Sequence, residues 1–441
     1  MRELYSIVMA VLQPLLRLKL WQRGRKEPGY RVYPAERWGN YPHLVADDAA
    51  SSHVWNESSM AYRPTVWIHA VSLGETRAAA VLLAALRPLL PGMRLLLTHG
   101  TATGRAEGAG LLQVGDRQVW LPWDTPVAVD QFLRRFQPVL GVLIETEVWP
   151  NLVAACHTRG MPLLLVNARL SKKSLAKARR LRWLARPAYQ ALSAVYAQTH
   201  ADAQRLGQLG APVHDVLGNL KFDAQPSFAL LAQGQQWRSA WMQQHVRQTV
   251  VLFAISREGE EALFLAHLKT LSLAQRQAVQ WLIVPRHPQR FDAVAALAQA
   301  QGFSVTRRSQ WGAHGPASAA PADIWLGDSL GEMPLYYALA DLALLGGSFL
   351  PLGGQNLIEA AACGCPVIMG PHTFNFAEAA GASVAAGAAF EVRDLPEGVN
   401  TACDLLHKPD LLQACRQAAR TFVAAHRGAA ARTAAVIAQR V

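Results

Sequence analysis

Cysteine is scarce in this 441-residue chain, and no two cysteines have the C-x-x-C spacing. The five are Cys156, Cys363, Cys365, Cys403 and Cys415. A disulfide scaffold and a zinc or thioredoxin-type site are therefore excluded, and a reducing, cytosolic environment is expected. Charged residues are also few, at 17%, whereas 51% of the residues are hydrophobic. A chain with this many apolar residues can bury a large core, so a disordered or collagenous protein is excluded.

Acidic residues are under-represented in the first half of the chain. Residues 1–222 contain 27 basic and 15 acidic side chains, whereas residues 223–441 contain 16 of each, so the net charge of +12 lies in the first half. This asymmetry predicts an anionic partner, either nucleic acid, an acidic membrane surface or a phosphorylated substrate. The basic stretches lack a nucleic-acid recognition motif and adjoin apolar segments, so no nucleic acid is expected.

The amino terminus lacks an apolar run long enough for an ordinary spanning helix. Residues 5–16 are apolar except for Ser6, Gln13 and Pro14, short of the ~20 residues that spanning needs. The basic residues that follow are Arg17, Lys19, Arg23, Arg25 and Lys26. Residues 1–30 therefore predict a helix in the membrane interface, with its cations at the lipid headgroups. A core helix with a basic end is the alternative, and whether the helix spans or lies flat stays open.

Short apolar runs alternate with helical patterns along the rest of the chain. Their continuous apolar character is typical of parallel strands buried on both faces. Two such series predict two doubly wound, Rossmann-like α/β domains, residues 31–222 and 223–441, linked at residues 218–223. The expected strands are residues 65–69, 94–98, 118–121, 139–144, 162–166 and 194–197, then 249–253, 280–284, 303–306, 323–326, 342–345 and 366–369.

Candidate catalytic residues in the first domain follow the expected strands, because ligands bind beyond the carboxyl ends of parallel strands. Ser72, Gly74 and Glu75 come after the first strand, and Glu75 either caps the next helix or acts as a general base. Glu145 and Glu147 follow the fourth strand as a carboxylate pair. Since that strand is wholly apolar, a solvated surface explains this pair less well than a functional site does.

A basic stretch follows the fifth expected strand. It begins with Asn167, Arg169, Lys172 and Lys173. It continues with Lys177, Arg179, Arg180, Arg182 and Arg186. A solvated helix face is the usual structure of such a stretch, and contact with lipid phosphates is the alternative.

Glycines in the second half indicate a nucleotide site. Gly346-Gly347 ends a strand, and Gly353-Gly354-Gln355-Asn356 opens a helix that carries Glu359. Such glycines let backbone N–H groups approach a phosphate, and a carboxylate on the first turn suits a ribose diol. Neither a Walker motif nor an early G-x-G-x-x-G is present, which excludes a Walker-type NTPase and counts against a nicotinamide or flavin enzyme. Glycines that only shape turns are the alternative.

Six motifs in this order resemble those of the 3-deoxy-D-manno-octulosonic acid (Kdo) transferases of lipopolysaccharide assembly. The resemblance covers nearly the whole chain. The motifs are Ser72-Leu73-Gly74-Glu75, Glu145-Thr146-Glu147-Val148-Trp149-Pro150, Asn167-Ala168-Arg169-Leu170-Ser171, Pro285-Arg286-His287, Gly327-Asp328-Ser329-Leu330-Gly331-Glu332 and Gly370-Pro371-His372-Thr373-Phe374-Asn375-Phe376.

The resemblance implies a GT-B glycosyltransferase, with an acceptor-binding and a donor-binding domain facing a cleft. It implies inverting transfer of Kdo from CMP-Kdo to a lipid A precursor of the lipid IVA type, at the cytoplasmic face of the inner membrane. CMP-Kdo would be a co-substrate, and no cofactor or metal is expected. The anionic membrane surface would be a further partner.

The resemblance also assigns roles to residues. Glu75 would be the catalytic base, with Glu145 and Glu147 as a second acidic site. Acceptor and lipid contacts would come from Ser72, Gly74, Asn167, Arg169, Lys172 and Lys173. Donor contacts would come from Ser256, Arg257, Pro285, Arg286, His287, Asp328, Gly331, Glu332, Gly346, Gly347, Gly354, Gln355, Asn356 and Glu359.

The chain departs from the family pattern at two donor-side positions. Arg257 and Gln355 stand where family members often have histidine, so Arg257 adds a potential phosphate contact and no proton transfer is assigned to Gln355. Two alternatives stay open from the sequence. One is another GT-B nucleotide-sugar enzyme, such as a heptosyltransferase or an epimerase; the other is a non-catalytic, membrane-docked nucleotide- or lipid-binding module.

Overall fold

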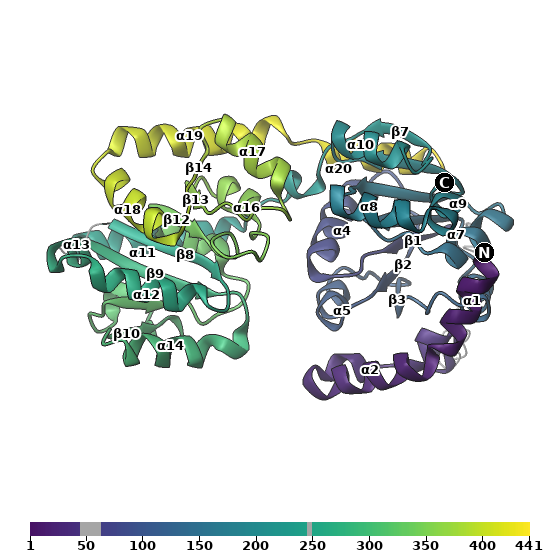
Figure 1. Cartoon of the computed structure of the whole chain (residues 1–441), viewed down its shortest axis with the longest axis horizontal. Coiled ribbons are helices and arrows are strands. Elements are labelled where there is room, and N and C mark those ends of the chain that lie inside the picture. Colours follow the sequence, from purple (N-terminus) through teal and green to yellow (C-terminus); the bar gives the residue numbers. More distant parts are fainter. Residues whose placement is uncertain (45–62, 245–248) are drawn as a thin grey trace. The chain divides into compact units, whose positions relative to one another are not determined.

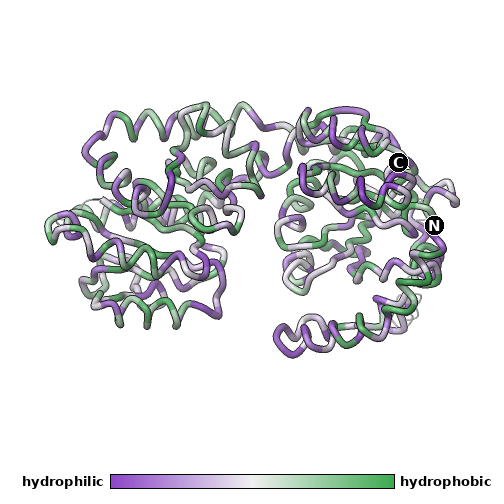
Figure 2. Tube along the Cα trace, in the orientation of Figure 1, coloured by the Kyte–Doolittle hydropathy of each residue, from purple (hydrophilic) through white to green (hydrophobic). Residues whose placement is uncertain are grey.

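The chain forms two compact units. A computed structural model describes residues 1–44, 63–244 and 249–441 (Figure 1). The first unit comprises Met1–Asp223 and Arg427–Val441, and the second comprises Ala224–His426. Hydrophobic residues concentrate in the strands of both units, as Figure 2 shows.

The first unit contains a seven-stranded parallel sheet in the order β3-β2-β1-β4-β5-β6-β7. Apolar runs form the five central strands, which are buried along most of their length. The strands are β1 (Thr65–His69), β2 (Arg94–His99), β3 (Arg117–Trp120), β4 (Leu140–Ile144), β5 (Leu163–Ala168), β6 (Ala194–Ala197) and β7 (Val213–Val216).

Helices cover both faces of this sheet and leave the carboxyl ends of the strands as the functional edge. Alternate residues of a strand enter opposite cores: Val66 and Ile68 lie in one cluster, and Trp67 lies in the other. The helices are α4 (Leu73–Leu86), α5 (Ala102–Ala109), α6 (Pro126–Phe136), α7 (Pro150–Thr158), α8 (Lys172–Arg180), α9 (Arg182–Gln190) and α10 (His200–Gly207), with 3₁₀ turns η1 (Pro28–Arg31), η2 (Pro34–Trp38) and η5 (Leu220–Asp223).

The last helix, α20 (Ala429–Ala438), returns to the first unit. Ala434 and Ile437 are buried in the same core as α4. The carboxylate of Asp223 accepts hydrogen bonds from the backbone N–H groups of Gly428 (2.5 Å) and Ala430 (2.7 Å), which caps the helix. The expected domain of residues 223–441 therefore needs correction, because residues 427–441 pack with the first unit.

The second unit contains another seven-stranded parallel sheet, in the order β10-β11-β9-β8-β12-β13-β14. Its central strands are again continuous apolar runs. The strands are β8 (Thr249–Ser256), β9 (Val279–Pro285), β10 (Val305–Arg307), β11 (Ile324–Leu326), β12 (Leu342–Leu345), β13 (Val367–Met369) and β14 (Ala389–Glu391).

Helices also cover this second sheet. An aromatic cluster supports one region of it, where Trp241 and Trp311 each pack edge-on against Trp325. The helices are α11 (Phe228–Gln244), α12 (Glu260–Thr270), α13 (Leu273–Ala278), α14 (Phe291–Ala300), α15 (Met333–Leu339), α16 (Leu357–Ala362), α17 (Ala377–Ala385), α18 (Leu395–Leu406) and α19 (Pro409–Ala425), with 3₁₀ turns η6 (Pro288–Arg290), η7 (Arg308–Gln310) and η8 (Pro316–Ser318).

The amino-terminal segment forms two helices, α1 (Arg2–Val11) and α2 (Gln13–Lys26), bent by 53° at their junction. Among the described residues, no single helix is long and apolar enough to cross a membrane. This bent pair, taken together, is the one segment there that has the length and apolar composition of a membrane span. Ser6 on α1 donates to Asn151 on α7 at 3.0 Å. The exposed apolar side chains of the pair are Leu4, Ile7, Val8, Val11, Leu12, Leu15, Leu18 and Trp21.

Candidate active site

The topology of the first sheet creates a site between β1 and β4. These strands are neighbours, yet the chain proceeds from β1 toward β2 and from β4 toward β5, in opposite directions. At such a switch point the loops after the two strands diverge and leave a crevice for a ligand. Ser72 ends the loop after β1, Glu75 lies in the first turn of the following helix, α4, and the loop after β4 carries Glu145 and Glu147.

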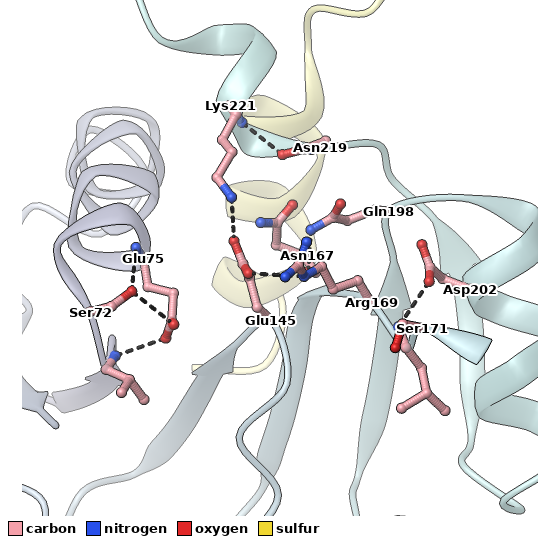
Figure 3. Close-up of polar contacts among 12 residues, drawn as sticks. Ser72, Glu75, Glu145, Asn167, Arg169, Ser171, Gln198, Asp202, Asn219 and Lys221 are labelled. Carbon is pink, nitrogen blue, oxygen red and sulfur yellow. Dashed lines mark hydrogen bonds and ion pairs between the residues drawn. The ribbon is translucent and has the colours of Figure 1, made fainter. Parts of the chain in front are cut away.

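Glu75 lies in the first turn of α4, where its side chain turns back toward the preceding loop (Figure 3). Its carboxylate accepts hydrogen bonds from the backbone N–H of Val71 (2.8 Å) and the hydroxyl of Ser72 (3.1 Å). The Ser72 hydroxyl also accepts from the backbone N–H of Glu75 at 3.4 Å. This arrangement resembles a capping box and fixes the position of the carboxylate.

The raised pKa of Glu75 is not explained by a role in helix capping alone. Burial raises its pKa to about 7, and the negative charges of Glu145 and Glu147 add to this rise, while the hydrogen bonds from Val71 and Ser72 oppose it. A helix amino terminus by itself favours the ionised form of a carboxylate. Glu75 is therefore a positioned carboxylate that changes protonation near neutral pH, as a general base requires.

Glu145 lies between two cations from distant parts of the chain (Figure 3). One carboxylate oxygen accepts a hydrogen bond from Nζ of Lys221 at 2.7 Å, and the other lies 3.2 Å from Nε of Arg169. The carboxylate is buried, and the backbone of Glu145 is left-handed, with φ of +66°. A left-handed non-glycine residue is strained, and such residues concentrate at functional sites.

Glu147 is half-buried beside this pair, and Nε1 of Trp149 donates to it at 2.8 Å. Burial raises the pKa of Glu147, and the hydrogen bond from Trp149 opposes the rise. The structure therefore brings all three sequence-predicted carboxylates into one electrostatic cluster.

The acceptor-side candidates after β5 extend the same edge. Asn167 is buried with φ of +51°, and its side-chain oxygen accepts from the backbone N–H of Leu220 at 3.1 Å. Arg169 is partly exposed beside Glu145. Lys172 and Lys173 are exposed at the start of α8. Asn167 thus ties the edge to the 3₁₀ turn that carries Lys221, while the cations beyond it stay accessible.

A buried polar network supports the loop that carries Glu75. Nδ1 of His99 lies 2.9 Å from the carbonyl oxygen of Ala70 and 3.3 Å from the hydroxyl of Thr76. The same hydroxyl donates to the carbonyl oxygen of Ser72 at 2.9 Å. Burial lowers the pKa of His99 to about 4, so this histidine is neutral at physiological pH. The network fixes the loop without adding a charge beneath Glu75.

The second sheet has its own switch point, between β8 and β12. Ser256 ends β8 and Arg257 follows it, and Gly346 and Gly347 follow β12, so these donor-side candidates gather there. A Cβ on Gly346 would lie 2.3 Å from the carbonyl oxygen of Ile255, so only glycine fits this close approach.

Glu260 stabilises the turn after β12 by accepting hydrogen bonds from its backbone. Its carboxylate accepts from the backbone N–H groups of Arg257 (2.9 Å), Gly347 (2.8 Å) and Phe349 (3.2 Å). Burial raises its pKa, and these hydrogen bonds oppose the rise. Ser256 donates to Glu261 at 2.8 Å, and Glu261 also pairs with Arg290. The acidic start of α12 therefore orders the glycine turn.

The second glycine pair packs against the first. The backbone N–H of Gly354 donates to the carbonyl oxygen of Gly347 at 2.7 Å, and a Cβ on Gly347 would lie 3.2 Å from Nε2 of Gln355. Asn356 caps α16 by accepting from the N–H of Ile358 at 3.2 Å. Glu359 lies within α16, which has six residues, so a strong dipole from this short helix is not expected.

The remaining donor-side candidates occupy the ends of β9 and β11. Pro285 ends β9, the N–H of Arg286 donates to the carbonyl oxygen of Ser256, and burial lowers the pKa of His287. Asp328 accepts two hydrogen bonds from Ser309.

Glu332, beyond Gly331, accepts hydrogen bonds from Arg308 (3.0 Å) and Ser329 (2.6 Å). The carboxylates of Asp328 and Glu332 are thus engaged within the unit, and their contact with a donor stays a prediction.

Metal ligands do not cluster in the part of the chain that the structure describes. Within residues 1–44, 63–244 and 249–441, no group of three or more His, Cys, Asp or Glu side chains is placed to hold a metal ion.

Comparison with known proteins identifies the family. Residues 35–224 match the family described as 3-deoxy-D-manno-octulosonic-acid transferase (kdotransferase). A 3-deoxy-D-manno-octulosonic acid transferase from Bordetella pertussis is 45% identical over 98% of this chain and 97% of its own length. Another from Haemophilus influenzae is 30% identical over 92% of this chain and 90% of its own.

The chain belongs to the 3-deoxy-D-manno-octulosonic acid transferase family. It is therefore a glycosyltransferase, and the heptosyltransferase, epimerase and non-catalytic alternatives are set aside.

Solved structures confirm the GT-B type of fold for this Kdo transferase family member. UDP-GlcNAc 2-epimerase from Neisseria meningitidis, bound to UDP-GlcNAc, superposes with a TM-score of 0.56 and 14% identity over 85% of this chain and 99% of its own. A glycosyltransferase from Rickettsia africae ESF-5 superposes with a TM-score of 0.56 and 12% identity, over 86% of this chain and 98% of its own. At these identities the likeness concerns the fold alone.

Sequence reasoning missed two groups of this Kdo transferase site. Lys221 lay in a segment interpreted only as a linker, and its contact with Glu145 spans 76 positions. Glu260 was given no role, although a carboxylate four residues after Ser256, where β8 ends, is a visible signal. Neither role follows from local sequence, because each depends on which strands are neighbours.

Proposed function

We propose that this chain transfers Kdo from CMP-Kdo to a lipid A precursor of the lipid IVA type with inversion at the anomeric carbon. One observation carries the proposal beyond family membership: Glu75 is held by Val71 and Ser72 at the switch point of the first sheet, with its pKa raised to about 7. A carboxylate so poised accepts a proton from a sugar hydroxyl near neutral pH.

The chemistry is a single displacement. The carboxylate of Glu75 takes the proton of the acceptor hydroxyl while that oxygen attacks the anomeric carbon of Kdo. The bond from this carbon to the CMP phosphate breaks, and its electron pair leaves on CMP. Ser72 and the N–H of Val71 hold the base at 3.1 and 2.8 Å, so little reorganisation precedes proton transfer.

The second acidic group acts by position and charge. Glu145 is already paired with Lys221 and Arg169, so we assign it the placement of these two cations rather than proton transfer. Glu147 keeps the local potential negative, which favours a raised pKa at Glu75.

The second unit supplies the donor site. Gly346 and Gly347 lack side chains, so the phosphate of CMP can approach the backbone closely at the switch point, although their own N–H groups donate to Ala254 and Glu260. Arg257, Arg286 and His287 follow the adjacent strands and add donors for the charge that develops on the departing CMP. Glu359 and Asn356, near the start of α16, are assigned to the ribose, and Gln355 has no proton-transfer role.

The amino-terminal helices attach the enzyme to the cytoplasmic face of the inner membrane. Leu4, Ile7, Val11, Leu15 and Leu18 are all exposed, and the basic residues of α2 follow them. An exposed apolar stripe next to cations fits an anionic lipid surface. This position brings the enzyme to a lipid-borne acceptor.

Mass measurement of the product tests the proposal. The purified full chain is incubated with an under-acylated lipid A precursor and, in separate reactions, CMP-Kdo, a UDP-sugar or an ADP-sugar. The acceptor is expected to gain the mass of one or more Kdo units in the reaction with CMP-Kdo and in neither of the other two. Transfer from the UDP- or ADP-sugar, or CMP-Kdo binding without a mass gain, would contradict it.

A further inference from the structure

A surface groove of about 370 Å³ lies between α8 and α10, outside the carboxylate cluster. Leu175, Ala176 and Ala201 supply its apolar lining, and three cations, from Lys172, Arg179 and Arg205, line it as well. The volume is within the range of small-molecule sites.

Two of the three cations are held in place by hydrogen bonds. Arg179 donates to the side-chain oxygen of Gln208 at 2.7 Å, which ties α8 to the end of α10. Arg205 donates to a carboxylate oxygen of Asp202 at 2.7 Å and to the carbonyl oxygen of Leu170. Cations that are already ordered lose less conformational entropy when an anion binds.

Among the described residues of α8 and α10, the two helices that form the groove, Asp202 is the one acidic side chain, and it pairs with Arg205. Residues 171–201 contain no aspartate or glutamate. Asp202 is buried, and its carboxylate accepts from the N–H of Leu170 (2.8 Å) and the hydroxyl of Thr199 (2.7 Å) as well as from Arg205. The groove therefore has a net positive charge, which selects an anionic ligand.

Strand order connects the groove to the proposed base. The strands β1, β4, β5 and β6 are successive neighbours, so the segments after them follow one another along one sheet edge. Glu75 follows β1, Glu145 follows β4, and the segments after β5 and β6 lead into α8 and α10. Figure 3 shows Ser171 and Asp202, at the starts of these helices, beyond Arg169 on this edge.

We propose that this groove binds a phosphate group of the acceptor glycolipid. The inference rests on the proposed function, because it assigns a subsite to the same acceptor. Phosphate is matched by the guanidinium of Arg179 and the ammonium of Lys172, and charge-assisted hydrogen bonds of this kind are the strong ones. The apolar lining accommodates the less polar part of the molecule next to the phosphate.

The face of α8 offers a matched control. Lys172, Ala176 and Arg179 recur at helical spacing on the groove face, whereas Lys177 and Arg180 are exposed and do not line the groove. The test compares Lys172→Gln/Arg179→Gln with Lys177→Gln/Arg180→Gln. Both remove two positive charges from the same helix, so general electrostatics affects them equally. A charge-retaining variant, Lys172→Arg/Arg179→Lys, reports on folding.

The measurement is kcat and KM for the full chain in neutral detergent, with the bis-phosphorylated acceptor and with the same acceptor after enzymatic dephosphorylation. The groove variant is expected to raise the KM for the phosphorylated acceptor about tenfold, because two charge-assisted contacts are lost. Its KM for CMP-Kdo should be unchanged, and the control variant should stay within about twofold of wild type. The charge-retaining variant should raise the acceptor KM less than the groove variant does, because it keeps both charges but changes their geometry. With the dephosphorylated acceptor, the wild type and the groove variant should have the same acceptor KM.

Three results would overturn the inference. Equal KM increases in the two charge-removing variants would indicate general electrostatics, and a defect that persists with the dephosphorylated acceptor would exclude phosphate as the ligand. Loss of binding to acceptor-free anionic vesicles, with an unchanged KM in detergent, would assign the groove to phospholipid headgroups. If wild type transfers no Kdo at all, the proposed function itself fails, which is a distinct outcome.

Discussion

At the scale of single residues, one carboxylate combines two structural roles. Glu75 accepts from Val71 and Ser72, so it completes the start of α4, and it also lies near Glu145 and Glu147. Burial outweighs the hydrogen bonds and raises its pKa to about 7. Capping and base catalysis are therefore compatible, because both need a fixed carboxylate at the end of β1.

Lys221 is expected to tune this base. Lys221→Met removes a positive charge from the carboxylate cluster while Glu145 keeps its partner Arg169, so the pKa of Glu75 should rise. The acidic limb of the kcat/KM profile should move about half a unit to one unit toward higher pH. Lys221→Arg, which keeps the charge, serves as the control. A lower rate with an unmoved limb would mean that Lys221 matters only for folding.

Gly74 is expected to matter for substrate approach rather than for the backbone. A Cβ at Gly74 would meet nothing closer than the Ser72 hydroxyl at 4.0 Å, so Gly74→Ala fits the fold and should stabilise α4 by about 0.5–1 kcal/mol. The KM for the acceptor should rise severalfold, because the new methyl group adds bulk 4.0 Å from the hydroxyl of Ser72, which we assign to the acceptor side. Gly381→Ala in α17, where a Cβ meets nothing within 4 Å, is the matched control. An unchanged acceptor KM would remove Gly74 from the acceptor site.

Residue roles were predictable from sequence only where they follow a strand end directly. Glu75, Glu145 and Glu147 were found in this way, and the structure brings them together. Lys221 was missed because its partner is 76 positions away. Asp328 and Glu332 were found as polar residues after a strand, but their bonds to Ser309 and Arg308 depend on packing that local sequence does not encode.

At the scale of elements, the central strands and the edge strands β3 and β10 were predictable, whereas two other edge strands were not. Each of the twelve expected strands overlaps an observed one, because a strand buried on both faces is a continuous apolar run. The two missed strands, β7 and β14, lie at sheet edges. His214 and Asp215 in β7 are exposed, so this strand lacks an apolar run.

The return of α20 depends on one carboxylate. Asp223→Ala leaves the N–H groups of Gly428 and Ala430 without this acceptor, so the unfolding free energy should fall by about 1–2 kcal/mol. Asp223→Asn keeps an acceptor oxygen and should lose less. Urea unfolding of the full chain measures both variants. Equal stability of Asp223→Ala and wild type would show that apolar packing alone holds α20.

At the scale of the whole molecule, charge and hydropathy predict where the protein acts. Leu15→Glu/Leu18→Glu places two charges on exposed positions, which are 61% and 51% accessible, so the core is unaffected. Binding to anionic vesicles in a flotation assay should fall about tenfold or more, since apolar insertion is lost and repulsion is added. Val114→Glu/Val127→Glu, also at exposed apolar positions, should bind as wild type does. Equal binding by all three proteins would contradict the membrane role of α1 and α2.

The most direct test of base catalysis is the pH dependence of kcat/KM for wild type and Glu75→Gln with CMP-Kdo and the lipid acceptor. Because Glu75 must be ionised to accept a proton, wild-type kcat/KM should fall tenfold per pH unit below about pH 7. Glu75→Gln should stay folded, lose roughly 10²–10⁴-fold in rate, and no longer show that limb. Near-wild-type activity of Glu75→Gln with the limb intact would contradict the assignment of Glu75 as the base.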